Sequence, residues 1–206
     1  MKPKKSTIIV LISIVIVTLV ILFMYVQYNS AKIGSSYNTE DINTNELILA
    51  YRFRSFAWGF SDYVYLINAD GSIKYVDIAS ELGNDFSLDT KESFAILDEL
   101  SVNVDIPVLY NAEKISDSNI NKIINIQNVK LKRNKEVAND AGYIGYYCVV
   151  GTKDERKMIC IKEGGEFPRV CKNKNINMIC NLMDDIVTET RKMTKSEKQI
   201  SFLMFR

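Results

Sequence analysis

The chain has 206 residues, of which 26 are Lys or Arg and 25 are Asp or Glu, so its formal charge at pH 7 is +1. This length suits one domain, a hydrophobic fraction of 47% excludes a disordered chain, and the near-neutral charge gives no strong field for nucleic acid. The chain contains no histidine, which excludes the Ser-His-Asp triad, the Cys-His pair and metal sites built on histidine.

The N-terminal segment combines Lys2, Lys4 and Lys5 with an uncharged and largely apolar run over residues 7–28. A helix of about 22 residues spans about 33 Å, which matches the hydrocarbon thickness of a bilayer. The sequence therefore predicts a transmembrane helix over residues 7–28 that contacts the lipid bilayer.

The lysines predict the orientation of this helix, because positive charge favours the cytoplasmic side. Residues 1–6 would form a cytoplasmic stub of a single-pass signal-anchor protein in the cell membrane. The polar residues 29–45 would form a tether to an extracytoplasmic domain over residues 46–206. The alternative is a cleaved signal peptide, but its apolar region would span about 7–15 residues and end at a small-residue cleavage site.

The first part of the domain has the patterns of strands. Alternation over residues 47–60 predicts a strand with one buried face, bulged near Ser55 where the aromatic positions change parity. Residues 63–68 and 73–78 flank Asp70-Gly71, a dipeptide that favours the two-residue type I′ turn of a β-hairpin.

Three helices are predicted from capping residues and apolar spacing. The first would begin at Asp89, whose carboxylate can cap the first turn, with Glu92 three residues later as in a capping box. The second would cover residues 116–129 and the third residues 175–189, each with isoleucines on one side. Pro107 predicts extended chain between the first two helices.

The remaining segments predict a β-meander over residues 143–150, 157–163 and 167–171, with a tight turn at Gly164-Gly165 and turn-tip charges at Glu163 and Glu166. The apolar tail, residues 200–205, is compatible with an edge strand. The basic run in residues 130–140 is interpreted as a solvated loop, because no aromatic residue is interleaved to stack on bases. Together these elements predict an α+β fold: an antiparallel sheet of five to seven strands with about three helices on one side.

Four cysteines lie in the last third of the chain: Cys148, Cys160, Cys171 and Cys180. The absence of a C-x-x-C motif from the sequence argues against a zinc ribbon or a thioredoxin-like site, and we expect no metal and no cofactor. Outside the membrane, disulfides are one hypothesis, and buried free thiols are the other. In a hairpin centred on Asp154, Cys148 would oppose Cys160, while all three disulfide connectivities stay open.

The candidate binding residues are Arg52, Arg54, Phe56, Trp58 and Phe60. Aromatic side chains beside guanidinium groups suit glycan stacking or a protein hot spot. The alternative interpretation is that the aromatic rings fill the core. If they form a contact surface, Trp58→Ala should abolish partner capture and leave the melting temperature unchanged.

These observations predict a membrane-anchored, extracytoplasmic binding or interaction module that is non-catalytic and contacts a protein or an envelope component, with no nucleic acid. One alternative is a histidine-free surface hydrolase, which needs two carboxyl groups about 5–9 Å apart. The other is a structural membrane component whose partner is another transmembrane helix, although the apolar span has no small-xxx-small face.

Overall fold

The computed structural model describes residues 16, 18–21, 42–56, 60–83, 85–133, 142–152 and 155–204, with side chains up to residue 193. The chain divides into two units, Met1–Ser36 and Tyr37–Arg206. In the first unit, residues 16 and 18–21 are helical. Most of the predicted anchor, residues 7–28, thus lies outside the described residues, and none of the described helices combines the length and apolarity needed to cross a bilayer.

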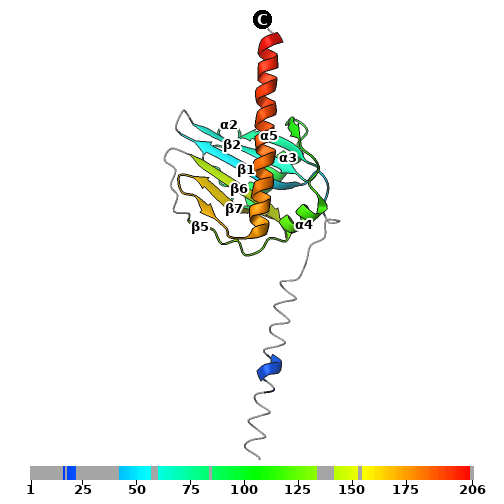
Figure 1. Ribbon diagram of the computed structural model, residues 1–206, viewed down its shortest axis with the longest axis vertical. Helices are drawn as coiled ribbons and strands as arrows, with labels where there is room; N and C mark the ends of the chain where they lie inside the picture. The colour runs from blue at the N-terminus through cyan, green and yellow to red at the C-terminus, as the bar shows by residue number, and fades with distance from the viewer. Residues whose placement is uncertain are drawn as a thin grey trace, which may run out of the picture. The chain divides into compact units, whose positions relative to one another are not determined.

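The second unit has the predicted α+β class. Its described residues form one eight-stranded antiparallel sheet in the order β4-β3-β2-β1-β6-β7-β8-β5 (Figure 1). The strands are β1 (Leu47–Ser55), β2 (Ser61–Asn68), β3 (Ser72–Asp77), β4 (Val108–Asn111), β5 (Lys132–Arg133), β6 (Tyr143–Val150), β7 (Lys157–Gly165) and β8 (Arg169–Val170). The helices are α2 (Ile78–Glu81), α3 (Lys91–Val102), α4 (Asp117–Ile124) and α5 (Lys174–Met204).

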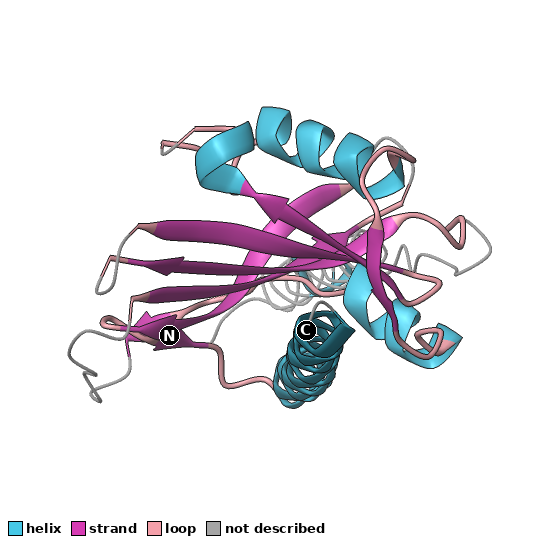
Figure 2. Ribbon diagram, turned by 90° about the horizontal axis from the view of Figure 1, so that it is seen from above, coloured by secondary structure: helices cyan, strands magenta, loops and turns pink. Residues whose placement is uncertain are grey.

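Helices cover both faces of the sheet, so the prediction of helices on one side is wrong. Figure 2 shows α2 and α3 on one face and α5 with α4 on the other. Two hydrophobic clusters fill the two interfaces. The α3-side cluster includes Leu66, Val76 and Leu97, and the α5-side cluster includes Ile73 and Ile179. The predicted strand count of five to seven is also too low, because β4 and the short strand β5 add the two edges of the sheet.

Strand β1 lies at the centre of the sheet between β2 and β6. Its residues from Leu47 to Tyr51 are all buried, because both faces of the strand are covered. The single buried face inferred from alternation is therefore wrong. The predicted bulge near Ser55 is also wrong, because β1 ends at Ser55 and its irregularity falls between Leu47 and Leu49.

The β2–β3 hairpin forms around Asp70-Gly71 as predicted, but its loop is longer by one residue. Tyr65 opposes Tyr75 and Ile67 opposes Ile73, which leaves the three residues Ala69 to Gly71 in the loop. Gly71 has a φ of 87°, and a Cβ there would lie 2.5 Å from the backbone oxygen of Ala112. Three-residue loops place glycine in this left-handed conformation.

The three predicted helices exist with shifted ends. Helix α3 starts at Lys91, because Thr90 and not Asp89 is the N-cap, with its hydroxyl accepting from the Ser93 amide. Helix α4 begins at Asp117, one residue after the predicted start because Ser116 is its N-cap, and it ends at Ile124 instead of residue 129. Helix α5 continues to Met204, so residues 200–204 are helical and the prediction of an edge strand there is wrong. Its predicted inward residues are buried: Ile176, Ile179, Met183, Ile186 and Val187.

Helix α5 crosses the sheet, and its last turns extend past the sheet (Figure 1). Two polar contacts fix its position. Asp184 accepts a 2.5 Å hydrogen bond from the Tyr146 hydroxyl, and Arg191 donates to the hydroxyls of Tyr51 and Tyr63 at 3.4 and 3.2 Å. The Arg191 guanidinium also lies 5.6 Å from the Tyr51 ring centre. Together with an ion pair between Lys162 and Asp184 at 3.6 Å, these contacts add directionality to a largely apolar interface.

Candidate functional site

A pocket of about 500 Å³ opens at the end of the sheet where β1 and β7 finish and β6 begins. Its wall combines residues from five segments: Phe56 after β1, Arg133 of β5, Tyr143 of β6, Glu163 of β7 and Phe167 before β8. Pockets of about 300–1,000 Å³ with apolar walls and a few polar groups are typical ligand sites. This volume and lining make the pocket a candidate binding site.

Exposed phenylalanine rings gather at this pocket. Phe56 and Phe167 line it and are 69% and 57% exposed, and Phe60, at 40%, lies with its ring centre 5.1 Å from that of Phe56. Two of these rings have a guanidinium group beside them. The guanidinium carbon of Arg54 lies 6.0 Å from the ring centre of Phe60, and that of Arg133 lies 5.3 Å from the ring centre of Phe167. We call Phe56, Phe60 and Phe167 the phenylalanine rim. Adjacent exposed aromatic side chains are a common feature of interaction sites.

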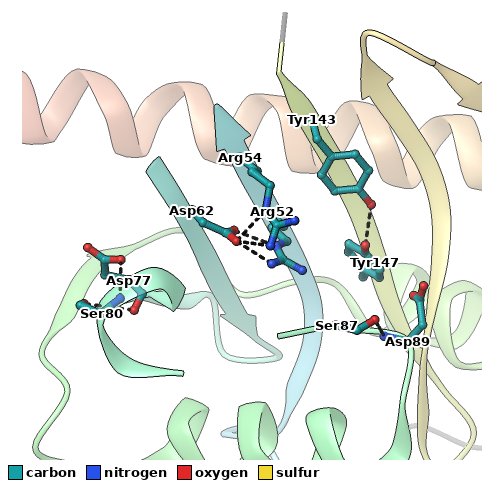
Figure 3. A network of polar contacts seen from close by, with 9 residues as sticks. All are labelled: Arg52, Arg54, Asp62, Asp77, Ser80, Ser87, Asp89, Tyr143 and Tyr147. Atoms are coloured by element: carbon teal, nitrogen blue, oxygen red, sulfur yellow. Dashed lines mark hydrogen bonds and ion pairs between the residues drawn. The ribbon is translucent and has the colours of Figure 1, made fainter. Parts of the chain in front are cut away.

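Arg52 and Arg54 converge on one buried carboxylate. Figure 3 shows both guanidinium groups directed at Asp62. Arg52 donates through Nε and Nη2 at 2.8 and 2.6 Å, and Arg54 donates through Nε at 2.8 Å. The side chains of Asp62 and Arg52 are 0% and 6% exposed, whereas that of Arg54 is 27% exposed. Arg52 therefore supports the structure beneath the rim, and Arg54 reaches the surface beside Phe60.

A second ion pair stiffens the pocket wall. Arg169 donates through two nitrogens to the two carboxylate oxygens of Glu163. The hydrogen bonds that Arg169 donates to Glu163 raise the pKa of Arg169, so its guanidinium group stays charged. Glu163 is buried, so the prediction of a turn-tip charge is wrong for this residue. Glu166 is exposed and follows the end of β7, in agreement with that prediction.

Two tyrosines lie next to each other at the pocket: Tyr143 lines it, and Tyr147 belongs to the α3-side cluster. The hydroxyls of Tyr143 and Tyr147 lie 2.6 Å apart. Figure 3 shows the two side chains joined by this hydrogen bond. Burial raises the pKa of Tyr143 to about 12 and raises that of Tyr147 as well. Burial also raises the pKa of Cys160, which opposes Tyr147 across the strands, to about 12. Neither the hydroxyls nor the thiol are therefore suited to act as a base or nucleophile near neutral pH.

Glycines allow two chain segments to meet at the pocket. Gly165 has a φ of 97°, and a Cβ there would lie 2.0 Å from the backbone oxygen of Gly142. Gly142 has a φ of 66°, and its Cβ would lie 2.4 Å from the backbone oxygen of Arg54. Side chains are excluded at both positions by sterics and by the positive φ. The ends of β1, β6 and β7 can thus approach closely, and they form the pocket floor.

The structure brings together part of the predicted binding cluster. Arg54, Phe56 and Phe60 lie at one surface, and Phe56 and Phe60 are exposed instead of filling the core. Arg52 is buried in the ion pair with Asp62. Trp58 lies outside the described residues. The cluster does not share one strand face, because β1 ends before Phe56 and β2 begins after Phe60.

Sequence reasoning missed the residues that complete the pocket: Arg133, Tyr143, Phe167 and Arg169. Arg133 belongs to the run interpreted as a solvated loop, and Phe167 was assigned to a strand. The closeness of Phe167 to Arg133 becomes apparent only once β8 pairs with β5. The sequence offers no local signal for that pairing.

All four cysteines are free thiols in the structure. Cys148 opposes Ile159 and not Cys160, so the predicted opposition is wrong by one residue. Because successive side chains alternate between faces, Cys148 joins Cys180 in the α5-side cluster and Cys160 packs against the α3-side cluster. Among the described residues, no group of three or more Cys, Asp or Glu side chains is arranged to hold a metal ion.

Comparisons with protein-family models, with curated proteins and with solved structures find no match to this chain.

Proposed function

We propose that this protein is a membrane-anchored, extracytoplasmic binding module that is non-catalytic and contacts a protein or an envelope component through the phenylalanine rim and its pocket. The observation that carries this proposal is the rim itself: three exposed phenylalanine rings beside a pocket of about 500 Å³. Exposed aromatic residues at the edge of a concave site supply large contact area with little loss of side-chain entropy.

The position of the rim within the domain supports this role. The described part of the domain begins at Ile42, next to the N-terminal end of β1, and the rim follows the C-terminal end of that strand. Nine residues of extended chain span about 27 Å. The rim is therefore separated from the point where the predicted tether would join the domain. The uncharged, apolar residues 7–28 and the preceding lysines carry the proposal of the anchor and its orientation.

The polar groups of the pocket support binding over catalysis. A carboxylate-based hydrolase needs one carboxyl group to donate a proton and another to act as base or nucleophile. Of the two carboxylates that line this pocket, Glu163 accepts from two nitrogens of Arg169 through both of its oxygens, which leaves only Glu166 without an ion-pair partner among the described residues. The raised pKa of the Tyr143 hydroxyl also opposes its ionisation at neutral pH.

Proximity cross-linking of the full-length protein in its own membrane tests this function. The test variant is Phe56→Ala with Phe167→Ala, and the matched control is Val104→Ala, which removes a 92% exposed apolar side chain before the opposite edge strand β4. We expect one partner to be captured by the wild type and by the control, and to be lost from the double variant at an unchanged melting temperature. Equal capture by all three proteins would refute the proposed contact surface.

Protease added to intact cells tests the topology. We expect it to digest residues 46–206 and to leave the anchor segment protected. Survival of the domain in intact cells, with digestion after lysis, would refute the extracytoplasmic location.

A further inference from the structure

Among the described residues, two charged side chains of the pocket have no partner of opposite charge. Arg169 and Glu163 neutralise each other. By contrast, Arg133 contacts the Phe167 ring, and the described part of the chain supplies no carboxylate for its guanidinium. The carboxylate of Glu166 likewise has no cationic partner among the described residues. Both side chains are exposed. The pocket therefore offers one donor group and one acceptor group of opposite charge to a ligand.

The chemistry of these two groups specifies what they would bind. A guanidinium binds a carboxylate through two parallel N–H bonds, and a carboxylate accepts hydrogen bonds from an ammonium group. The exposed rings of Phe56 and Phe167 favour a flat apolar group, which gains by stacking and by burial of surface. A ligand that satisfies all three contacts carries an anion, a cation and an aromatic ring.

We propose that the pocket binds an aromatic α-amino acid, with its carboxylate on Arg133, its ammonium group on Glu166 and its ring against Phe56 and Phe167. This inference rests on the proposed function for the role of the pocket in binding, and it goes beyond that function by assigning the pocket a small-molecule ligand. A peptide terminus shares half of this chemistry, since it presents one of the two charges, and an internal peptide segment presents neither.

A titration of the full-length protein in detergent micelles with four probes tests the ligand class. The probes are L-phenylalanine, N-acetyl-L-phenylalanine (an anion), L-phenylalaninamide (a cation) and L-alanine (a zwitterion without a ring), with binding measured by ligand-observed NMR. We expect L-phenylalanine to bind about tenfold more tightly than each of the other three, because each lacks one contact. Tighter binding of the acetylated or amidated probe would instead indicate a peptide terminus and would overturn the proposal.

Two variants assign the charges to residues. Arg133→Gln should weaken L-phenylalanine about tenfold and leave the amide unchanged, whereas Glu166→Gln should weaken L-phenylalanine similarly and leave the acetylated probe unchanged. Lys157→Gln, an exposed substitution on β7, is the matched control. All three sites are exposed, so melting temperatures should stay equal and a binding change cannot come from unfolding.

The outcomes separate this inference from the proposed function. If no probe binds at millimolar concentration, or if the variants do not alter probe preference, the ligand assignment is wrong even when the rim captures a partner in the membrane. If the probes bind as expected but the Phe56→Ala, Phe167→Ala double variant captures the partner normally, the ligand assignment holds and the proposed contact surface for the partner fails.

Discussion

Replacing Asp62 by asparagine should destabilise the domain strongly. Asp62 is fully buried and accepts from both Arg52 and Arg54 at 2.6–2.8 Å. Asparagine has nearly the same volume but no charge. The two guanidinium groups would therefore lie side by side without a neutralising carboxylate, and that of Arg52 is buried away from water. Removing one partner of a buried ion pair costs about 3–5 kcal/mol. Because the amide oxygen can still accept a hydrogen bond, we expect the lower end, about 3 kcal/mol, or a fall of about 6–12 °C in melting temperature.

The fall in melting temperature can be measured by thermal unfolding of the full-length protein in micelles. The near-ultraviolet circular dichroism of the packed tyrosines reports the unfolding. The matched control is Glu189→Gln, which neutralises an exposed carboxylate paired with Lys192 on α5. Such surface pairs contribute about 0–1 kcal/mol. If Asp62→Asn and Glu189→Gln melt within about 2 °C of each other, the Arg52–Asp62–Arg54 cluster does not hold the strands together as argued.

Three further perturbations probe backbone strain, helix docking and thiol burial. Gly165→Ala should cost at least about 2 kcal/mol more in urea unfolding than Gly83→Ala, since both have positive φ but only the former would clash with a backbone oxygen; equal losses would exclude the clash. Arg191→Ala should cost about 1–2 kcal/mol and speed amide exchange in the last turns of α5, because it removes the contacts with Tyr51 and Tyr63; unchanged exchange would contradict that docking role. Burial raises the pKa of Cys160 to about 12, that of Cys180 to about 11 and that of Cys148 well above its ordinary value, so all three thiols stay protonated at pH 8. Iodoacetamide at pH 8 should therefore label them only after urea is added, and rapid labelling of the folded protein would refute this.

The elements best predicted from the sequence are those whose pattern is local. Strand β6 has the predicted bounds, residues 143–150, and the isoleucines on one side of residues 116–124 are buried in α4. An apolar stripe with helical or strand spacing reports directly which side chains must leave water. Helix ends were less predictable, because Asp89 and Thr90 are both good caps and the sequence does not decide between them.

Strand register was predicted wrongly in two hairpins for one physical reason. A loop with one residue more or less shifts every pair and moves side chains to the opposite face. The extra loop residue at Ala69 to Gly71 and the one-residue shift that sets Cys148 against Ile159 both depend on loop geometry. The relation between Cys148 and Cys160 was reversed by this shift alone.

The sequence predicted only some of the residues of the candidate site. Arg54, Phe56 and Phe60 are close along the chain, so the sequence alone shows an arginine followed by aromatic residues and predicts a binding cluster there. Arg133 and Phe167 are far from them in sequence, and they reach the same pocket through the pairing of β5 with β8 and of β6 with β1.

The amino-acid sequence alone determined the α+β class and the inward faces of α4 and α5, because hydrophobic periodicity follows from the local geometry of helices and strands. The tertiary structure decided that helices cover both faces of the sheet, that Arg52 is buried against Asp62, and that the pocket forms where β1 and β7 end and β6 begins. Those features depend on which distant strands become neighbours, and that choice is made by packing of the whole core and not by any single segment.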